Sequence, residues 1–444
     1  MTMAATSAPL DAERHLADLI RHLTDVLVEY RQKERRSGRE PELDHEVELA
    51  RTSARAFFDR RISESVVSGL AIPDTNAEAD LTRRAIDTLL GFGPLQRLLN
   101  DPDITDIHVR GSAPIWVKRR DGSRLELDPV VASDDELVRL VRNVASRSRH
   151  GERRFDASTV ECNLCLDDGS RLFAVMDVSQ HPALVIRKHQ FELASLDELR
   201  RGGSMSEQVA TFLRAAVLAR RNVIVVGGTG SGKTTLLRAL INEIPFDERI
   251  VTIEDAYELG IERFAQLHPD HDALQSRSAN IEGHGAIPLS DLTRMALRMD
   301  PDRVIIGEVR GAEAFPMLLA MSQGNNGSMC TLHADSTQSA FSKLAAYVSM
   351  ANTGLPVEVV NLLIATAVHL VVHVELSTGR RKITGIREVV DSDGPRIVSN
   401  ELFSSVPGSD CRVAYPMSSN LRVILAAHGY DESSESPAMS RSVH

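Results

Sequence analysis

A phosphate-binding loop constrains this chain more than any other feature of its sequence. Residues 227–235 read GGTGSGKTT, and they directly follow the short apolar run Val223–Val226. From Thr235 on, the sequence TLLRAL is typical of the first turns of a helix. A buried strand, a glycine-rich turn and a helix in this order are the setting that such a loop requires, whereas a glycine-rich run alone would also fit a flexible linker. The sequence therefore predicts a nucleoside triphosphate site.

Each position of this loop has a chemical reason. Glycine lets the backbone curl until successive N–H groups point at phosphate oxygens, and the following helix adds partial positive charge. Lys233 is expected to reach the β- and γ-phosphates, and the Thr234 hydroxyl to ligate Mg²⁺. We expect ATP, with its Mg²⁺, to be bound by Gly227, Gly228, Thr229, Gly230, Ser231, Gly232, Lys233, Thr234 and Thr235.

Composition excludes several classes of protein. The net charge of −11 argues against a bulk electrostatic grip on nucleic acid, and an aromatic content of 4% argues against stacking platforms for single-stranded bases. The N-terminus lacks the pattern of a secretory signal, and the most apolar late stretch, residues 357–374, is interrupted by polar and charged residues. We therefore expect a cytoplasmic protein without a membrane span, which reaches a membrane only through its partners.

The four cysteines do not form a disulfide framework. Cys162 and Cys165 make a lone C-x-x-C pair with no second pair beside it. This pattern favours thiols buried in a strand over a zinc site.

The hydrophobic pattern divides the chain into four parts. We expect a partly disordered helical extension over 1–79, a smaller α+β domain over 80–191, an α/β nucleotide-binding domain over 192–430, and a disordered tail over 431–444. In the extension, one helical face carries Leu16, Leu19, Ile20, Leu23, Leu27 and Val28. In the nucleotide-binding domain, helical segments alternate with apolar runs at 223–226, 249–253 and 303–306, which predicts a largely parallel sheet.

Three later stretches supply groups that triphosphate hydrolysis needs. Glu254 and Asp255 end the apolar run at 250–253, and Glu308 ends the run at 303–306, so both stretches place acids where strand ends face a ligand crevice. His333 follows at a spacing that suits a sensor of the γ-phosphate. The alternatives are ordinary solvated acids that close strands, and a structural histidine.

These motifs together resemble a known family. The order of the phosphate-binding loop, TIEDAYEL, DPDRVIIGEVRG and GNNGSMCTLHADS is similar to that of the type II/type IV secretion ATPase superfamily, in particular its tad/Flp pilus-assembly, CpaF-like branch. The last three stretches then correspond to the family's Asp box, Walker B segment and His box. The resemblance covers roughly residues 83–390, and it implies a RecA-like core with a smaller N-terminal domain.

The resemblance also implies roles for individual residues. Glu308 would orient the attacking water, and Glu254 would help to hold Mg²⁺ or that water. His333 would couple hydrolysis to motion. Arg171 and Arg187 of the smaller domain would clamp over the phosphates, although the residues alone would suggest ordinary exposed arginines. Arg277 belongs to a family loop that also includes Asn280, Glu282 and Gly283.

The His box departs from the family at one position. Most members carry two histidines there, but this chain has Asn325 where the first would stand, while His333 remains. An asparagine can donate and accept hydrogen bonds but cannot carry charge.

The function implied is an ATP-hydrolysing motor. We expect a homo-hexamer that acts on inner-membrane platform proteins and powers pilus assembly or type II-like secretion. The alternatives are the ATPase of a conjugative or type IV secretion apparatus, and, with less support, a nucleic-acid translocase or a nucleotide-gated scaffold.

Overall fold

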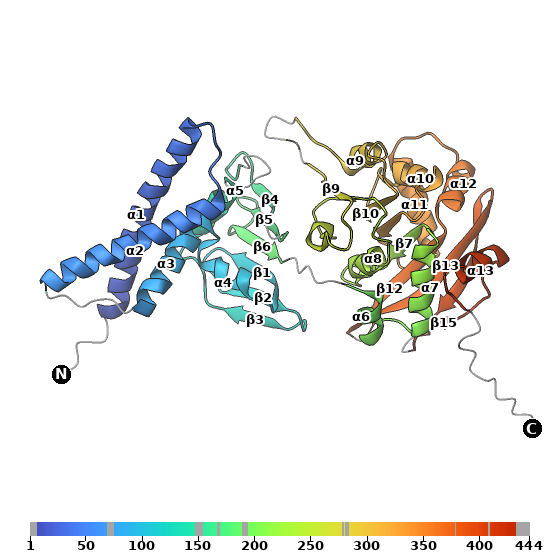
Figure 1. The fold of residues 1–444 in the computed structure, drawn as a ribbon, viewed down its shortest axis with the longest axis horizontal. Helices are drawn as coiled ribbons and strands as arrows, with labels where there is room; N and C mark the ends of the chain where they lie inside the picture. Colours follow the sequence, from blue (N-terminus) through green and yellow to red (C-terminus); the bar gives the residue numbers. More distant parts are fainter. Residues whose placement is uncertain are drawn as a thin grey trace, which may run out of the picture. The chain divides into compact units, whose positions relative to one another are not determined.

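The chain divides into two compact units, residues 1–189 and 190–444, in a computed structural model (Figure 1). The structure describes residues 7–68, 75–146, 154–166, 169–188, 194–277, 279, 284–377, 379–406 and 409–431.

The first unit begins with three helices that pack against one another. They are α1 (Ser7–Arg36), α2 (Leu43–Ser68) and α3 (Thr75–Leu90). Leu19 and Leu23 of α1 are fully buried in their shared core, as the helical periodicity predicts, whereas Val28 of the same apolar face is 45% exposed. The helices α1 and α2 are separated by a short break that contains Pro41, which lacks the N–H that a helix interior needs.

The rest of the first unit is a sheet whose described strands are all antiparallel, with helices on its buried side. The strand order is β3-β2-β1-β6-β5-β4. The strands are β1 (Ile104–Arg110), β2 (Ile115–Arg119), β3 (Arg124–Leu127), β4 (Glu161–Cys165), β5 (Arg171–Val175) and β6 (Ala183–Arg187), and the helices are η1 (Gly93–Leu95), α4 (Gln96–Asn100) and α5 (Asp134–Ala145). β3 has no predicted counterpart, and its side chains are mostly exposed. Cys162 is buried in β4, as expected for a strand thiol.

The second unit is built on a sheet of nine strands among the described residues. Its order is β15-β14-β13-β12-β7-β11-β10-β8-β9, and every pair from β12 to β9 is parallel. The parallel strands are β7 (Val223–Val226), β8 (Ile250–Glu254), β9 (His271–Gln275), β10 (Arg303–Val309), β11 (Met329–Leu332) and β12 (Leu370–Ser377). The antiparallel extension is β13 (Arg380–Asp393), β14 (Arg396–Ser404) and β15 (Arg412–Val413). The predicted parallel α/β core is confirmed.

Helices cover both faces of this sheet (Figure 1). Val223 and Val225 of β7 face one core, to which α7, α8 and α13 contribute, whereas Ile224 and Val226 face the other, to which α9 to α12 contribute. The helices are α6 (Leu196–Arg201), α7 (Glu207–Leu218), α8 (Lys233–Ile241), η2 (Ile261–Phe264), α9 (Leu289–Ala296), α10 (Ala314–Ser322), α11 (Ser339–Met350), α12 (Val357–Ala367) and α13 (Ser419–Ala426). Burial on both faces explains why the parallel strands read as continuous apolar runs.

The apolar stretch at 357–374 forms α12 and the first part of β12. Across the described residues, no helix combines the length and the apolar character that crossing a membrane would need.

One fully buried side chain, Asn222, joins the strand starts of this sheet to two helices. Its Nδ2 donates to the carbonyls of Met321 and Ala367 at 2.9 and 2.6 Å. Its Oδ1 accepts the backbone N–H groups of residues 327 and 328, and its own N–H donates to Nδ1 of His369 at 2.8 Å. Each polar group that Asn222 buries is therefore paired, which a packed interior requires.

His369 makes the stability of the second unit dependent on pH. Burial, reinforced by Arg221, lowers the pKa of His369 to about 4, so the imidazole stays neutral in the folded chain while an unfolded one protonates near pH 6.5. Stability from this group is present above pH 6.5 and is lost as the pH falls toward 4. We expect the wild type to lose about 2 kcal/mol between pH 7.5 and 5.0 from this group, and His369→Gln to lose less. Urea unfolding at both pH values measures the free energy of unfolding of each protein. An equal loss of this free energy in the wild type and in His369→Gln would contradict the prediction.

Candidate functional site

The backbone of the phosphate-binding loop is held in conformations that favour glycine. Gly227, Gly230 and Gly232 have φ of 154°, 73° and 101°. A Cβ on Gly227 would lie 2.1 Å from the Val374 carbonyl oxygen of β12, so the loop is pressed against its neighbouring strand. Gly228, Thr229 and Gly230 are exposed at the tip, and Thr234 and Thr235 lie in the first turn of α8. The loop therefore has the curl that a phosphate cradle needs.

Two polar side chains in this loop fit an anion. Lys233 is buried, its Nζ donates to the Gly228 carbonyl at 3.0 Å, and burial lowers the pKa of its ammonium group. The Ser231 hydroxyl is also buried, and it has no hydrogen-bond partner within the described part of the chain. A phosphate oxygen can take up both donors, so the loop suits the predicted triphosphate.

The structure brings Glu308, His333 and Lys233 together. His333 Nε2 lies 2.7 Å from Oε1 of Glu308 and 3.5 Å from Lys233 Nζ. Burial and then the Lys233 ammonium lower the pKa of His333, while Glu308 opposes the shift. A neutral imidazole that donates its Nε2–H to Glu308 accounts for the short contact. Three predicted residues from β10, α8 and the end of β11 thus form one cluster.

Glu308 is also contacted from its other side by Arg310. Arg310 Nε donates to Oε2 of Glu308 at 2.6 Å, and its NH1 reaches Oδ2 of Asp255 at 3.5 Å. The Asp box and the Walker B segment are thereby joined at the ends of β8 and β10.

Glu254 explains why glycine precedes Glu308. A Cβ on Gly307 would lie 3.1 Å from Cγ of Glu254, so a larger residue would crowd that side chain. Glu254 is 2% exposed, and its Oε1 accepts the backbone N–H groups of Glu258 and Leu259 at 2.7 and 2.8 Å. These bonds fix the carboxylate at the end of β8.

Mg²⁺ would be bound mainly through the nucleotide. Among the described residues, no group of three or more histidine, cysteine or acidic side chains is arranged to hold a metal ion. Magnesium keeps several waters and takes one or two protein oxygens plus phosphates, so the Thr234 hydroxyl and the fixed Glu254 carboxylate are a sufficient protein contribution. Their assignment as ligands stays a prediction.

The arginines predicted to clamp the phosphates belong to the first unit. Arg171 of β5 and Arg187 of β6 are paired across the sheet, and Arg187 contacts Asp106 at 3.1 Å with its side chain 72% exposed. Since the phosphate-binding loop lies in the second unit, the clamp stays a prediction. Of the family loop, Arg277 donates through Nε to the Gly285 carbonyl at 2.7 Å, whereas Asn280, Glu282 and Gly283 lie outside the described residues.

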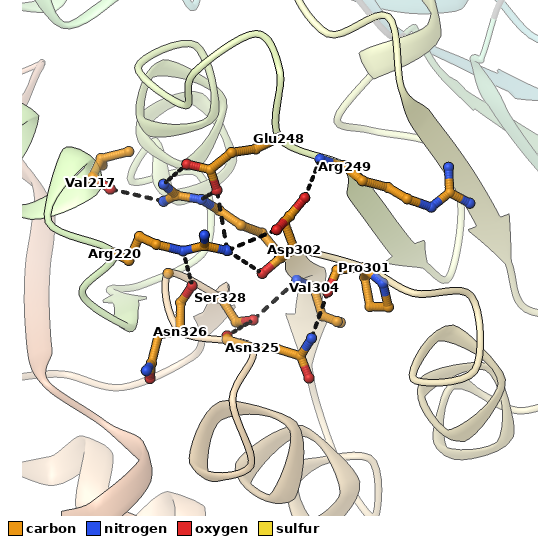
Figure 2. Close-up of polar contacts among 12 residues, drawn as sticks. Val217, Arg220, Glu248, Arg249, Pro301, Asp302, Val304, Asn325, Asn326 and Ser328 are labelled. Atoms are coloured by element: carbon orange, nitrogen blue, oxygen red, sulfur yellow. Dashed lines mark hydrogen bonds and ion pairs between the residues drawn. The ribbon is translucent and has the colours of Figure 1, made fainter.

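Asn325 lies at the opposite end of the sheet from the cluster. Figure 2 shows it among the polar contacts around the start of β10, where its Nδ2 donates to the Pro301 carbonyl at 2.6 Å. Nearby, fully buried Arg303 pairs with Glu248 at 2.7 Å. Arg220 reaches Asp302 at 3.2 Å (Figure 2). The first position of the His box therefore has a structural contact in this chain, and His333 alone of the two His-box positions contacts Glu308.

The sequence motifs assign no role to two arginines that the structure places at the site. Arg310 follows Glu308 in the Walker B segment, and Arg381 of β13 lies outside the four motifs. Arg381 packs over Gly232 and its Nε lies 3.4 Å from the Gly230 carbonyl oxygen. No local pattern identifies Arg381, because it reaches the loop only through the pairing of β12 with β13.

Several known proteins are similar to this chain. A family model described as Type II/IV secretion system protein matches residues 88–380. A Mycobacterium tuberculosis protein that is provisionally named a conjugal transfer protein is 34% identical over 331 residues, covering 72% of this chain and 90% of that protein. The type IV secretion system protein VirB11 of Brucella suis is 32% identical over 335 residues, covering 69% of this chain and 90% of that protein. The crystal structure of the VirB11 ATPase from Brucella suis with sulphate is 30% identical and covers 66% of this chain and 94% of that chain, with a TM-score of 0.36.

Gly227 and Gly228 offer a matched test of the loop. In Gly227→Ala the new Cβ would meet a backbone oxygen, whereas a Cβ on Gly228 has no heavy atom within 4 Å. We expect Gly227→Ala to cost about 1–3 kcal/mol of stability and to weaken nucleotide binding, and Gly228→Ala to stay near the wild type in stability. Thermal unfolding measures the stability of the two variants, and titration with a fluorescent ADP analogue measures their nucleotide affinity. Equal values in the two variants would argue against the close contact between the loop and β12.

Asn325 can be tested by restoring the family residue. An imidazole N–H can also donate to the Pro301 carbonyl, so Asn325→His is expected to keep ATPase activity within about twofold. Asn325→Leu leaves that buried carbonyl without its donor and should lose about 1–2 kcal/mol of unfolding free energy. Activity assays and urea unfolding compare the two. A large change of kcat in Asn325→His would mean that this position acts in catalysis.

Proposed function

Because the chain belongs to the type II/IV secretion system protein family, we propose that it is the ATPase of a type IV secretion or conjugal-transfer apparatus. The chain is an ATPase of RecA-like fold. The observation that carries the proposal is the meeting of Lys233, Glu308 and His333 at the carboxyl ends of the parallel strands. Ligands of open α/β sheets bind at this edge.

The cluster divides the work of hydrolysis among its residues. Lys233 and the loop N–H groups bind the triphosphate, and the Lys233 ammonium meets the charge that develops on the γ-phosphate. Glu308 orients a water molecule and accepts its proton as the water oxygen bonds to the γ-phosphorus and the bond to the ADP oxygen breaks. His333 keeps Glu308 oriented through its 2.7 Å contact. Mg²⁺, when bound through Thr234 and Glu254, supplies positive charge at the phosphate oxygens.

The assembly that fits this site is a ring of identical chains. We propose a homo-hexamer in which Arg171 and Arg187 of the first unit close over bound nucleotide and in which hydrolysis reopens that unit. The movement would be passed to inner-membrane proteins of the apparatus, so the chain would work in the cytoplasm at that membrane. The family supports this assembly. So does the chemistry, because the phosphate-binding loop contacts the triphosphate from one side only and a cation from elsewhere must meet the charge on the γ-phosphate.

The pilus-assembly branch is the second candidate. The motif set favours it, whereas the names of the two relatives reported above refer to conjugal transfer and to type IV secretion, which favours the first candidate. Deleting the gene separates the two. Loss of plasmid transfer or of secreted substrate with normal surface pili supports the first proposal, and loss of pili with intact transfer supports the second.

A nucleic-acid translocase and a nucleotide-gated scaffold would each show different kinetics. Turnover of a translocase would be stimulated by DNA or RNA, which the net charge of −11 does not favour. A scaffold would bind ATP without turnover, although both acids predicted to act in hydrolysis, Glu254 and Glu308, are present.

Steady-state ATPase assays test the assignment of the cluster. We expect Lys233→Ala and Glu308→Gln each to lower kcat by about 100-fold, because one removes a phosphate contact and the other the water-orienting carboxylate. Glu308→Gln should still bind nucleotide, and light scattering should find six copies per particle when nucleotide is present. Glu358→Gln on the exposed face of α12 is the control and should behave as wild type. Tight ATP binding without turnover by the wild type would favour the scaffold.

A further inference from the structure

Glu308 is held by donors on both of its carboxylate oxygens. His333 Nε2 lies 2.7 Å from Oε1, and Arg310 Nε donates to Oε2 at 2.6 Å. The Glu308 side chain is 19% exposed, whereas that of Arg310 is 51% exposed. The half-enclosed carboxylate is therefore oriented by two partly exposed partners, since the side chain of His333 is 39% exposed.

Arg310 extends these contacts to two further strands. Its NH1 lies 3.5 Å from Oδ2 of Asp255, which follows β8, and Oδ1 of Asp255 accepts the Ser276 hydroxyl at 2.7 Å. Ser276 directly follows β9, and its backbone N–H donates to the Glu254 carbonyl at 2.9 Å. A line of side-chain contacts thus runs along the edge of the sheet from β11 through β10 and β8 to β9.

The backbone of Arg310 is fixed independently of its side chain. Buried Glu313 accepts the backbone N–H groups of Arg310 and Gly311 through Oε1. Any rearrangement of the pair is therefore a movement of the guanidinium group, which can lengthen its contact to Glu308 or to Asp255 without moving β10.

We propose that Arg310 is a positioning residue that orients Glu308 for catalysis and connects the state of Glu308 to the Asp255–Ser276 corner at the end of β9. The inference rests on the proposed ATPase function, to which it adds a residue and a route of coupling. The planar fork of arginine suits this position, because two of its nitrogens can bind different carboxylates at once. A lysine can keep the charge but not both contacts.

Kinetics separate positioning from nucleotide binding. We expect Arg310→Gln to lower kcat on the order of tenfold or more while KM and the Kd for a fluorescent ADP analogue change less than about twofold. Arg310→Lys should recover part of kcat. Arg294→Gln, which breaks an exposed pair with Asp291 on α9, is the control and should match the wild type. A raised KM and Kd with kcat retained would overturn the proposal, since Arg310 would then be a nucleotide ligand.

A double variant tests the route to Asp255. If Asp255 acts through Arg310, Asp255→Asn should lower kcat about threefold in the wild-type background and have no further effect in Arg310→Gln. Effects that multiply would overturn the connection, because they would mean that the two residues act separately.

Hydrogen exchange of the nucleotide-free protein tests the coupling without any turnover. The amide of Ser276 should exchange at least about threefold faster in Arg310→Gln than in the wild type or in Arg294→Gln, because the corner loses one of its contacts. Unchanged exchange would overturn the coupling even if the enzyme is active. If Ser276 exchanges faster in Arg310→Gln but the wild type shows no ATPase activity, the coupling stands and the proposed function is removed instead.

Discussion

The site depends on the parallel register of the central strands of the second unit. Val226, the last residue of β7, pairs with Leu332 of β11, and Leu332 pairs in turn with Val309 of β10. The residues that follow these three are Gly227, His333 and Arg310, so the loop, the histidine and the arginine emerge side by side. Ile306 of β10 pairs with Ile253 of β8, which sets Gly307 beside Glu254. A slip of one residue in any of these pairs would turn the polar group away from the site.

Strand β10 shows how one motif can serve two ends of a sheet. Asp302, just before the strand, pairs with Arg220, and Arg303, its first residue, pairs with Glu248, so both anchor the edge where the strands begin. Glu308 near its end and Arg310 just after it lie at the edge where the strands end. The apolar residues between them are buried on both faces. The stability of the sheet and the chemistry of the site therefore make separate demands on the same short stretch of sequence.

The sequence predicted those features that a local pattern determines. The apolar run before the phosphate-binding loop matches β7 from Val223 to Val226, and the acids after two further runs lie at strand ends as expected. Contacts between distant segments were not predictable in this way. Arg381 reaches the loop through strand pairing, and Asn325 occupies a position that its motif alone would associate with catalysis. Val28 continues the apolar face of its helix in the sequence, but its side chain lies outside the part of that face that the neighbouring helices bury.

The buried Asn222 has a consequence for how the second unit folds. Its side chain and N–H bond to groups that lie between 99 and 147 residues further along the chain. Such contacts form only after long loops have closed, and folds dominated by them are slow. During synthesis, β7 emerges well before β12 and must wait, unpaired on that side, until residue 369 has left the ribosome. A nascent chain of this protein therefore carries an exposed apolar strand for much of its synthesis, when it would be most vulnerable to aggregation and most in need of a chaperone.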